Sequence, residues 1–230
     1  HTRFKCDWSS DVCSSDLNIT PLFVKHTALQ QQHADYVATA DYNHVKWHSG
    51  LGYLPLLVTI PLETIQLELQ AVKSHMKDIA DLYTPGWLNF SMYAPTELET
   101  GDSYWHPLAL ELMPETIRWF KSEWPAKSFY RMRMLGLAPG GQLGVHHDDC
   151  DGLDNINIGI EHPEGCDFYL ENSGIIPFAN GRVFALDAGR RHAVINNSST
   201  VRYHLTIYQE DDQRFKDLMV KSYHEYFKNT

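Results

Sequence analysis

The sequence predicts a mainly β protein, an antiparallel sandwich or barrel with helices covering the outer face of one sheet. Many short strand-like runs follow one another at close spacing between residues 128 and 209, with turn residues between them. Two helical patterns precede this region and a short one follows it. A chain of 230 residues is compatible with one domain that buries a sizeable core without disulfide bonds.

The first half of the chain contains two predicted helices and one strand. The stronger helix runs from Thr64 to Tyr83, because its apolar residues recur at helical spacing, and the pair Pro85-Gly86 ends it. Residues 87–93 alternate like a strand, and a polar loop follows over residues 95–103. The second helix opens at Pro114, since proline is favoured in a first turn, and it runs to about Trp124.

From Ser128 onward the apolar period becomes two residues, which is typical of strands. Within residues 155–161 the isoleucines lie on one face, and Asn155 and Asn157 lie on the other. Asn180-Gly181 is a strong signal for a tight turn. A short helix from residue 211 to about 227 closes the chain. The predicted strands are residues 129–138, 143–148, 155–161, 166–171, 182–187, 192–196 and 201–209.

Composition limits the possible classes of function. Apolar residues make up 43% of the chain and charged residues 21%, which are the proportions of a globular protein. The net charge of -10 argues against nucleic acid and anionic membranes as partners, because both require a basic surface. No apolar run is long enough to span a bilayer. The sequence does not reveal the oligomeric state.

The N-terminal segment and the cysteines bear on domain organisation and compartment. Residues 1–17 resemble a translated sequencing adapter and lack the apolar stretch and cleavage site of a signal peptide. We expect one domain over residues 18–230: helices and strands that buttress the core (18–127), the core barrel (128–209) and a closing helix (210–230). Cys150 and Cys166 then remain, which indicates a reducing, cytoplasmic compartment; a single bridge between them is the alternative.

The chemistry-bearing residues are concentrated in residues 139–149, where a glycine-rich turn precedes two histidines and two acids. Residues i and i+2 of a strand point to the same side, so His146 and Asp148 are expected to project together. His192, on a later strand, supplies a third ligand. Two imidazoles and one carboxylate on one face leave the opposite face open, which suits non-haem Fe(II) that binds oxygen and a cosubstrate.

Three other interpretations remain open from these residues alone. His147 and Asp149 form the alternative pair, which points to the opposite side of the strand. Zinc accepts the same set of two histidines and one carboxylate. An isolated His-x-Asp triplet also occurs in ordinary loops.

Arg202 adds a basic group to the predicted cavity. His192 and Arg202 flank a turn at residues 196–199, and they oppose each other on one face if Asn197 is the centre of an antiparallel hairpin. A guanidinium binds a carboxylate through two parallel hydrogen bonds, so this pairing predicts an acidic ligand beside the metal. The alternative is a surface arginine paired with an acid on a neighbouring strand.

Three short motifs follow one another in the chain. Residues 137–148 read LAPGGQLGVHHD, residues 181–187 read GRVFALD, and residues 192–202 read HAVINNSSTVR. Over about residues 86–209 the chain resembles the aspartyl/asparaginyl β-hydroxylase-like group of 2-oxoglutarate/iron(II) oxygenases. That group includes hydroxylases of peptidyl residues and of free amino acids such as proline. The glycine-rich turn sets the register of the first motif and selects His146 and Asp148.

The resemblance implies a double-stranded β-helix, a jelly-roll, cupin-like barrel with the site inside. It implies a dioxygenase that hydroxylates its substrate with Fe(II), 2-oxoglutarate and O2 and releases succinate and CO2. Arg202 would hold the distal carboxylate of 2-oxoglutarate. Asn155 and Asn157 depart from the arginine and histidine that relatives with peptidyl substrates often carry there. The implied metal ligands are His146, Asp148 and His192, and the candidate cofactor-binding residues are Arg202, Asn155, Asn157 and His204.

The expected substrate is an amino acid or a peptidyl side chain, and the compact chain favours a small molecule. A non-catalytic cupin-type barrel that binds a metal or a small ligand is the main alternative, and a hydrolytic zinc enzyme is a more distant one. Aromatic segments around Trp47 and Trp105 could form a lid at the barrel mouth. Aromatic side chains in loops are, however, more often packed.

Overall fold

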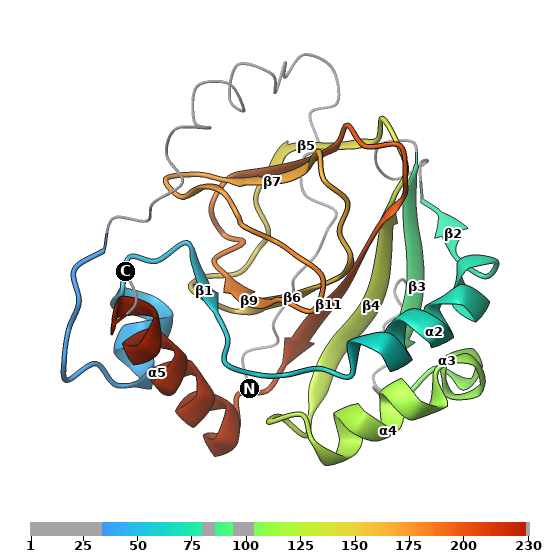
Figure 1. The fold of residues 1–230 in the computed structure, drawn as a ribbon. Coiled ribbons are helices and arrows are strands. Elements are labelled where there is room, and N and C mark those ends of the chain that lie inside the picture. The colour runs from blue at the N-terminus through green and yellow to red at the C-terminus, as the bar shows by residue number, and fades with distance from the viewer. Residues whose placement is uncertain (1–33, 80–85, 94–103, 229–230) are drawn as a thin grey trace.

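A computed structural model describes residues 34–79, 86–93 and 104–228 (Figure 1). Its strands form two antiparallel sheets, one ordered β1-β9-β6-β11-β4-β3-β2 and the other β5-β10-β7-β8. The strands are β1 (Tyr53–Pro55), β2 (Lys77–Asp78), β3 (Trp87–Tyr93), β4 (Phe129–Leu137), β5 (Gln142–His146), β6 (Asn155–Glu161), β7 (Cys166–Leu170), β8 (Gly174–Ile175), β9 (Val183–Leu186), β10 (His192–Asn196) and β11 (Arg202–Gln209).

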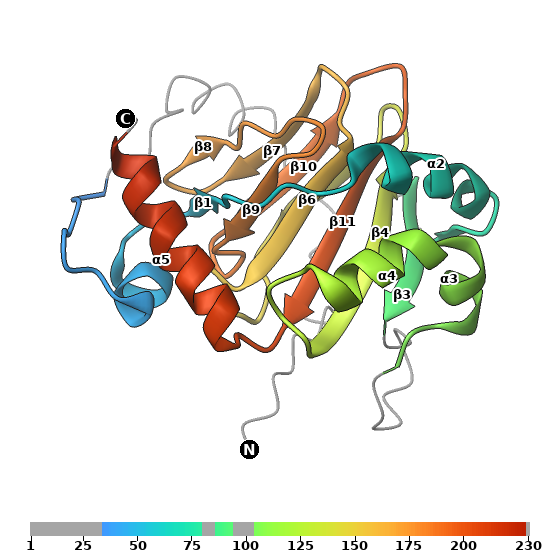
Figure 2. The ribbon, with the colours of Figure 1, turned by 60° about the horizontal axis from the view of Figure 1, so that its bottom comes forward.

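The smaller sheet lies over the larger one (Figures 1 and 2). One apolar cluster joins the facing sides, with Leu135 and Leu137 from β4 meeting Leu143, Phe168 and Val194 from the smaller sheet. The predicted mainly β, jelly-roll class is confirmed. Among the described residues no strand of one sheet pairs with a strand of the other, so the barrel is built from two facing sheets.

Helices cover the outer face of the larger sheet, as the sequence predicts (Figure 2). On β6, Ile156, Ile158 and Ile160 point outward into the main core, because side chains of a strand alternate between faces. Ile65 and Leu69 belong to the same core and are fully buried. The helices are α2 (Leu62–Lys73), α3 (Pro107–Leu112), α4 (Pro114–Ser122) and α5 (Gln213–Lys228), which packs near β1.

The predicted helix from Thr64 to Tyr83 is too long. The helix ends at Lys73, and the chain then forms β2, which pairs antiparallel with β3. The N–H of Ile79 continues this pairing by donating to the carbonyl of Trp87 at 2.9 Å. Backbone pairing with a neighbouring strand thus outweighs the helical spacing of the later apolar residues. Residues 80–85, and the predicted loop over 95–103, lie outside the described residues.

Most predicted strands agree with the structure to within two residues. β3, β6 and β10 have the predicted bounds, whereas β5 ends at His146 and leaves Asp148 in the following loop. The sequence did not predict α3, the very short strands β1, β2 and β8, or a short π-helix, η1 (His44–His48). These elements contain too few residues to show a period.

The predicted hairpin between β10 and β11 is wrong. β10 pairs with β5 and β7, whereas β11 pairs with β4 and β6, so the two strands belong to different sheets. Asn196 organises the crossing between the sheets. Its fully buried amide nitrogen donates to the carbonyl oxygens of Leu137 at 2.8 Å and Thr200 at 2.9 Å, and its oxygen accepts from the N–H of Ser198 at 3.0 Å.

A buried ion pair connects the N-terminal region to the loop before β6. The Lys46 ammonium lies 2.5 Å from Asp154 and 2.6 Å from Asp211, and the lysine side chain is 6% exposed. The Tyr42 hydroxyl also donates to Asp211. The carbonyl of Lys46 accepts from the N–H of Leu153 at 3.1 Å, so both the backbone and the side chain hold this loop.

Replacing Lys46 by methionine is expected to lower the free energy of unfolding by about 3–5 kcal/mol, because the change leaves the carboxylates of Asp154 and Asp211, which are only 11% and 14% exposed, without this counter-charge. Urea denaturation measures the loss. Lys228→Met is the matched control, since this exposed lysine pairs with Glu225 on its own helix and its stability loss should be much smaller than that of Lys46→Met. Equal stability losses in the two variants would contradict the prediction.

Candidate active site

His146 and His192 face each other directly in the pairing of β5 with β10, and their ring centres are 4.1 Å apart. Each ring is oriented by a backbone carbonyl. His146 Nδ1 lies 2.8 Å from the oxygen of Gly144, and His192 Nδ1 lies 2.9 Å from the oxygen of Arg190. Each Nδ1–H therefore donates to a carbonyl, which leaves Nε2 available as a metal ligand.

Asp148 completes the group from the loop after β5. Its N–H donates to the carbonyl of Ala188 at 2.9 Å, which fixes the loop although the strand has ended. One ligand atom from each of His146, Asp148 and His192 lies within 4.8 Å of the others. His146 and Asp148 thus converge through this loop and not through the strand alternation that the sequence suggested. The alternative residues His147 and Asp149 are both exposed.

The glycine-rich turn before β5 brings the two histidines together. Gly140 has a positive φ of 75°, a conformation that glycine adopts without strain. The N–H of Gly140 donates to the carbonyl of Asn196 at 2.7 Å, and the carbonyl of Gly141 accepts from the N–H of Asn196 at 2.9 Å. A Cβ at Gly141 would lie 2.7 Å from the Leu137 side chain. The turn therefore packs tightly and aligns β5 with β10.

The local environment favours a neutral imidazole at His146. Burial, followed by the neighbouring His192, lowers the pKa of His146 to about 4, although Asp148 opposes the shift. A neutral imidazole is the form that binds a metal. Phe168 stacks on His192 with ring centres 5.5 Å apart and so shields the pair. Two imidazoles and one carboxylate fit the donor set of non-haem Fe(II).

Arg202 lies in the same cavity as Asp148 and His192, and its side chain is 1% exposed. Among the described residues no carboxylate lies within salt-bridge distance of it. Burial lowers the pKa of Arg202 to about 10, so the guanidinium stays protonated at neutral pH. A buried cation of this kind requires an anionic partner. The cavity is lined by Trp87, Leu135, Leu143, Asp148, Asn155, Asn157, Phe168, Leu186, Ala188, His192, Val194, Arg202 and Thr206.

Two further histidines extend from Arg202. Arg202 Nη2 lies 2.8 Å from His204 Nδ1, and because arginine only donates, His204 accepts at that nitrogen. His204 Nε2–H then donates to Nδ1 of His162 at 2.8 Å. Asn157 lies 2.7 Å from His204 Nδ1 and 4% of its surface is exposed. The structure thus groups Arg202, His204 and Asn157 on the inner face of the larger sheet.

The stability of the protein is expected to fall as the pH decreases from about 6.5 to about 4. Burial and the charge of Arg202 lower the pKa of His162 from 6.5 to about 4. Between these two pH values the His162 imidazole takes up a proton in the unfolded chain but not in the folded protein, which favours unfolding as the pH falls. Burial and the charge of Arg202 also lower the pKa of His204. Thermal unfolding should show a shallower pH dependence for His162→Gln than for the wild type. Parallel curves for the two proteins would contradict this account.

Tyr208 is a site residue that the sequence analysis missed. Its hydroxyl donates to Asp148 Oδ2 at 3.0 Å, and Asn155 Nδ2 donates to the same hydroxyl oxygen at 2.5 Å. A signal was present, since alternate residues of a strand share a face and Arg202 and His204 already mark the inner face of β11. Asn155 lines the cavity and is also hydrogen-bonded to Tyr208.

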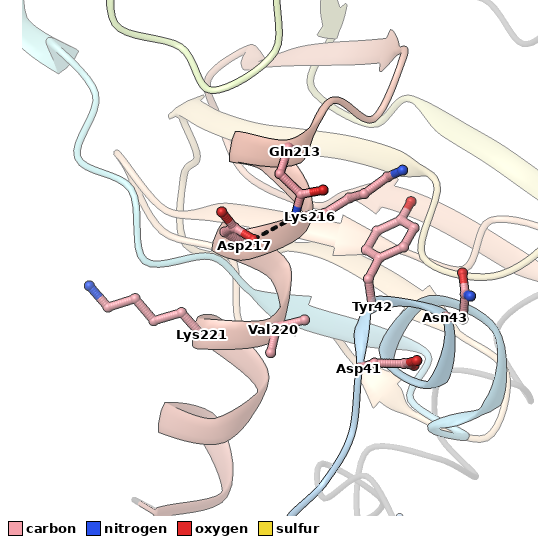
Figure 3. A pocket seen from close by; sticks show the side chains of 8 residues that line it. All are labelled: Asp41, Tyr42, Asn43, Gln213, Lys216, Asp217, Val220 and Lys221. Carbon is pink, nitrogen blue, oxygen red and sulfur yellow. Dashed lines mark hydrogen bonds between the residues drawn. The ribbon is translucent and has the colours of Figure 1, made fainter.

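A separate hollow of about 590 Å³ lies between α5 and the segment that precedes η1 (Figure 3). It is lined by Asp41, Tyr42, Asn43, Gln213, Lys216, Asp217, Val220 and Lys221, none of which is a predicted site residue. The aromatic residues proposed for a lid are partly packed. Tyr53 contacts Phe184, and Trp105 packs between Tyr93 and Phe129, although Trp47 is 42% exposed. No described helix has both the length and the apolar character needed to cross a bilayer.

A jelly roll with two histidines and a carboxylate between its sheets is typical of the 2-oxoglutarate- and iron(II)-dependent oxygenases. The chain matches the family Aspartyl/Asparaginyl beta-hydroxylase over residues 59–210, which is more than half of its length. It therefore belongs to the aspartyl/asparaginyl β-hydroxylase family. The protein is therefore a hydroxylase whose His/Asp/His group fits Fe(II), and not a non-catalytic barrel.

Several solved structures resemble this chain at low sequence identity. The non-heme alpha-ketoglutarate-dependent carbocyclase SnoK from nogalamycin biosynthesis is 13% identical, with a TM-score of 0.50 over 78% of this chain and 88% of that one. A 2OG-Fe(II) oxygenase family oxidoreductase from Burkholderia pseudomallei is 14% identical, with a TM-score of 0.49 and coverages of 78% and 93%. The collagen prolyl hydroxylase of Paramecium Bursaria Chlorella virus-1 is 15% identical, with a TM-score of 0.41 and coverages of 69% and 96%. No curated protein matches the sequence.

Proposed function

We propose that this protein hydroxylates a C–H bond of an amino acid, free or within a peptide, and converts 2-oxoglutarate and O2 into succinate and CO2. In this proposal His146, Asp148 and His192 hold the iron, and Arg202 holds the distal carboxylate of 2-oxoglutarate. One observation carries the assignment: a fully buried guanidinium lines the same cavity as Asp148 and His192, two members of the His/Asp/His group.

The protein contributes binding, orientation and exclusion of water. Bound iron and 2-oxoglutarate supply the oxidising chemistry that places one oxygen atom of O2 in the substrate. Arg202 offers a planar fork that matches a carboxylate, and His204, by accepting from Nη2, fixes the plane of that fork. Asn157 contacts His204 on the same wall of the cavity. Phe168 shields His192 from water, which strengthens the electrostatic interactions inside the cavity.

The proposed substrate is a small amino acid that is neutral or cationic overall. The net charge of -10 disfavours the approach of strongly anionic substrates and favours cationic ones. The cavity is narrow and mostly apolar apart from the ligand group, Arg202, the two asparagines and Thr206, which suits a small side chain better than a folded protein surface.

Iron-dependent formation of succinate from 2-oxoglutarate tests the proposal. The protein is incubated with Fe(II), 2-oxoglutarate and a panel of free amino acids and peptides, and mass spectrometry detects the gain of one oxygen atom. We expect succinate and hydroxylated product in equal amounts for one class of substrate, and neither product when a chelator removes the iron. If the metal-loaded protein does not bind 2-oxoglutarate in calorimetry, the proposal is wrong.

We also propose that residues 18–230 form a single oxygenase domain that works in a reducing compartment such as the cytoplasm. One hydrophobic cluster includes side chains from Ala40 to Tyr223, which supports a single domain. Cys150 and Cys166 are both thiols, which supports the compartment. Residues 1–17, expected to be foreign, lie outside the described residues.

A further inference from the structure

Asp148 is held by two buried side chains of the larger sheet. Its Oδ2 accepts the Tyr208 hydroxyl at 3.0 Å, and the oxygen of that hydroxyl lies 2.5 Å from Asn155 Nδ2. Tyr208 and Asn155 are each 5% exposed, and they lie on the paired strands β11 and β6. The contacts therefore connect a loop residue of the proposed metal centre to two paired strands of the larger sheet.

Chemistry fixes the direction of these hydrogen bonds. An ionised carboxylate only accepts, so Tyr208 uses its single hydrogen on Asp148. The tyrosine oxygen can then only accept, and Asn155 must present its amide N–H to it. The Asn155 carbonyl oxygen is buried and has no hydrogen-bond partner in the part of the chain that the structure describes. Asn155 is thus placed as a donor toward Tyr208.

We infer that Tyr208 and Asn155 are positioning residues that make Asp148 bind the metal through one oxygen, an inference that rests on the proposed function. Tyr208 occupies Oδ2, so Oδ1, which lies 3.8 Å from His146 Nε2, is the oxygen left for the metal. A carboxylate that binds through one oxygen leaves one more coordination position open than a chelating carboxylate. 2-Oxoglutarate and O2 both need such positions.

Tyr208→Phe removes the hydroxyl and keeps the ring. We expect Co(II) to bind the metal-free variant about 10–100-fold more weakly than the wild type, the usual cost of losing a group that supports a ligand. The visible absorption of bound Co(II) should also change, because Oδ2 becomes free to chelate the ion. Calorimetry gives the affinity, and thermal unfolding confirms that each variant is folded.

Asn155→Asp provides a second variant of nearly identical size. The new carboxylate accepts the Tyr208 hydrogen, so Asp148 loses its donor even though the tyrosine is intact. We expect weaker Co(II) binding and a changed spectrum, as in Tyr208→Phe. Asn155→Ala combined with Tyr208→Phe should bind Co(II) as tightly as Tyr208→Phe alone, because Asn155 acts through the hydroxyl.

Tyr203→Phe is the matched control, because Tyr203 is 6% exposed on the same strand but packs in the core on the opposite face. Its Co(II) affinity and spectrum should equal those of the wild type. Wild-type affinity and spectrum in folded Tyr208→Phe would overturn the inference while leaving the proposed metal centre standing. Failure of the wild-type protein to bind Co(II) would overturn the metal centre and the inference together.

Discussion

Arg202→Met is expected to weaken the binding of 2-oxoglutarate to the metal-loaded protein by about 30-fold or more. Losing one partner of a buried, hydrogen-bonded charge pair costs about 2–5 kcal/mol, and each 1.4 kcal/mol corresponds to about tenfold in affinity. Arg202 is 1% exposed and has no carboxylate partner among the described residues, so the cosubstrate is its proposed partner. Calorimetry with Mn(II)-loaded protein under anaerobic conditions measures the change.

Two further variants make this test specific. Arg202→Lys keeps the charge but loses the planar fork, so its affinity for 2-oxoglutarate should fall between those of the wild type and Arg202→Met. Arg182→Met, at an exposed arginine, should bind like the wild type. Metal affinity should be unchanged in all three variants. Wild-type affinity for 2-oxoglutarate in Arg202→Met would show that the cosubstrate binds elsewhere.

His146→Ala is expected to abolish turnover and to weaken metal binding. Losing a group that only supports a ligand costs about 10–100-fold in metal affinity, and losing the ligand itself should cost more. The neighbouring change, His147→Ala, should affect neither quantity, because His147 is exposed and His146 belongs to the converging group. Calorimetry with Co(II) and the rate of succinate formation provide the two measurements.

Asp148 and Asp149 allow the same comparison as the two histidines. Asp148→Ala should lose metal, and Asp149→Ala should retain it, since Asp148 belongs to the converging group and Asp149 is exposed outside it. If His147→Ala or Asp149→Ala loses metal while His146→Ala and Asp148→Ala retain it, the metal is bound by the alternative pair, His147 and Asp149. Because His146 and Asp148 are less exposed than their controls, thermal unfolding of each variant must show that it is folded.

The sequence allowed prediction of most of the regular sheet structure. Residues 155–161 show why. Their isoleucines face the helices and their asparagines face the interior between the sheets. The alternation of apolar and polar residues therefore indicates both that the segment is a strand and which of its faces points to the helices. The helix over residues 64–83 was overextended, because its spacing continues into residues whose backbone pairs with β3. Such pairing depends on a strand later in the chain and leaves no local signal.

The residues predicted for the candidate site lie close together in the structure, although the predicted strand geometry is not what brings them there. The structure groups His146, Asp148 and His192, and it places Arg202 in the same cavity. The expected hairpin does not form, because the chain crosses between sheets at Asn196, whose buried amide binds both Leu137 and Thr200. Spacing in sequence could not distinguish two residues side by side in one sheet from two that face each other across a sandwich.

The position of β5 at the edge of the smaller sheet has a kinetic consequence. Among the described strands β5 pairs only with β10, and these two strands carry the opposed residues His146 and His192. An edge strand is among the first elements to open locally. A metal bound by both histidines would lock this edge closed, and the ion would leave when the edge separates. Retention of iron during repeated turnovers would then depend on the lifetime of the backbone hydrogen bonds between two short strands.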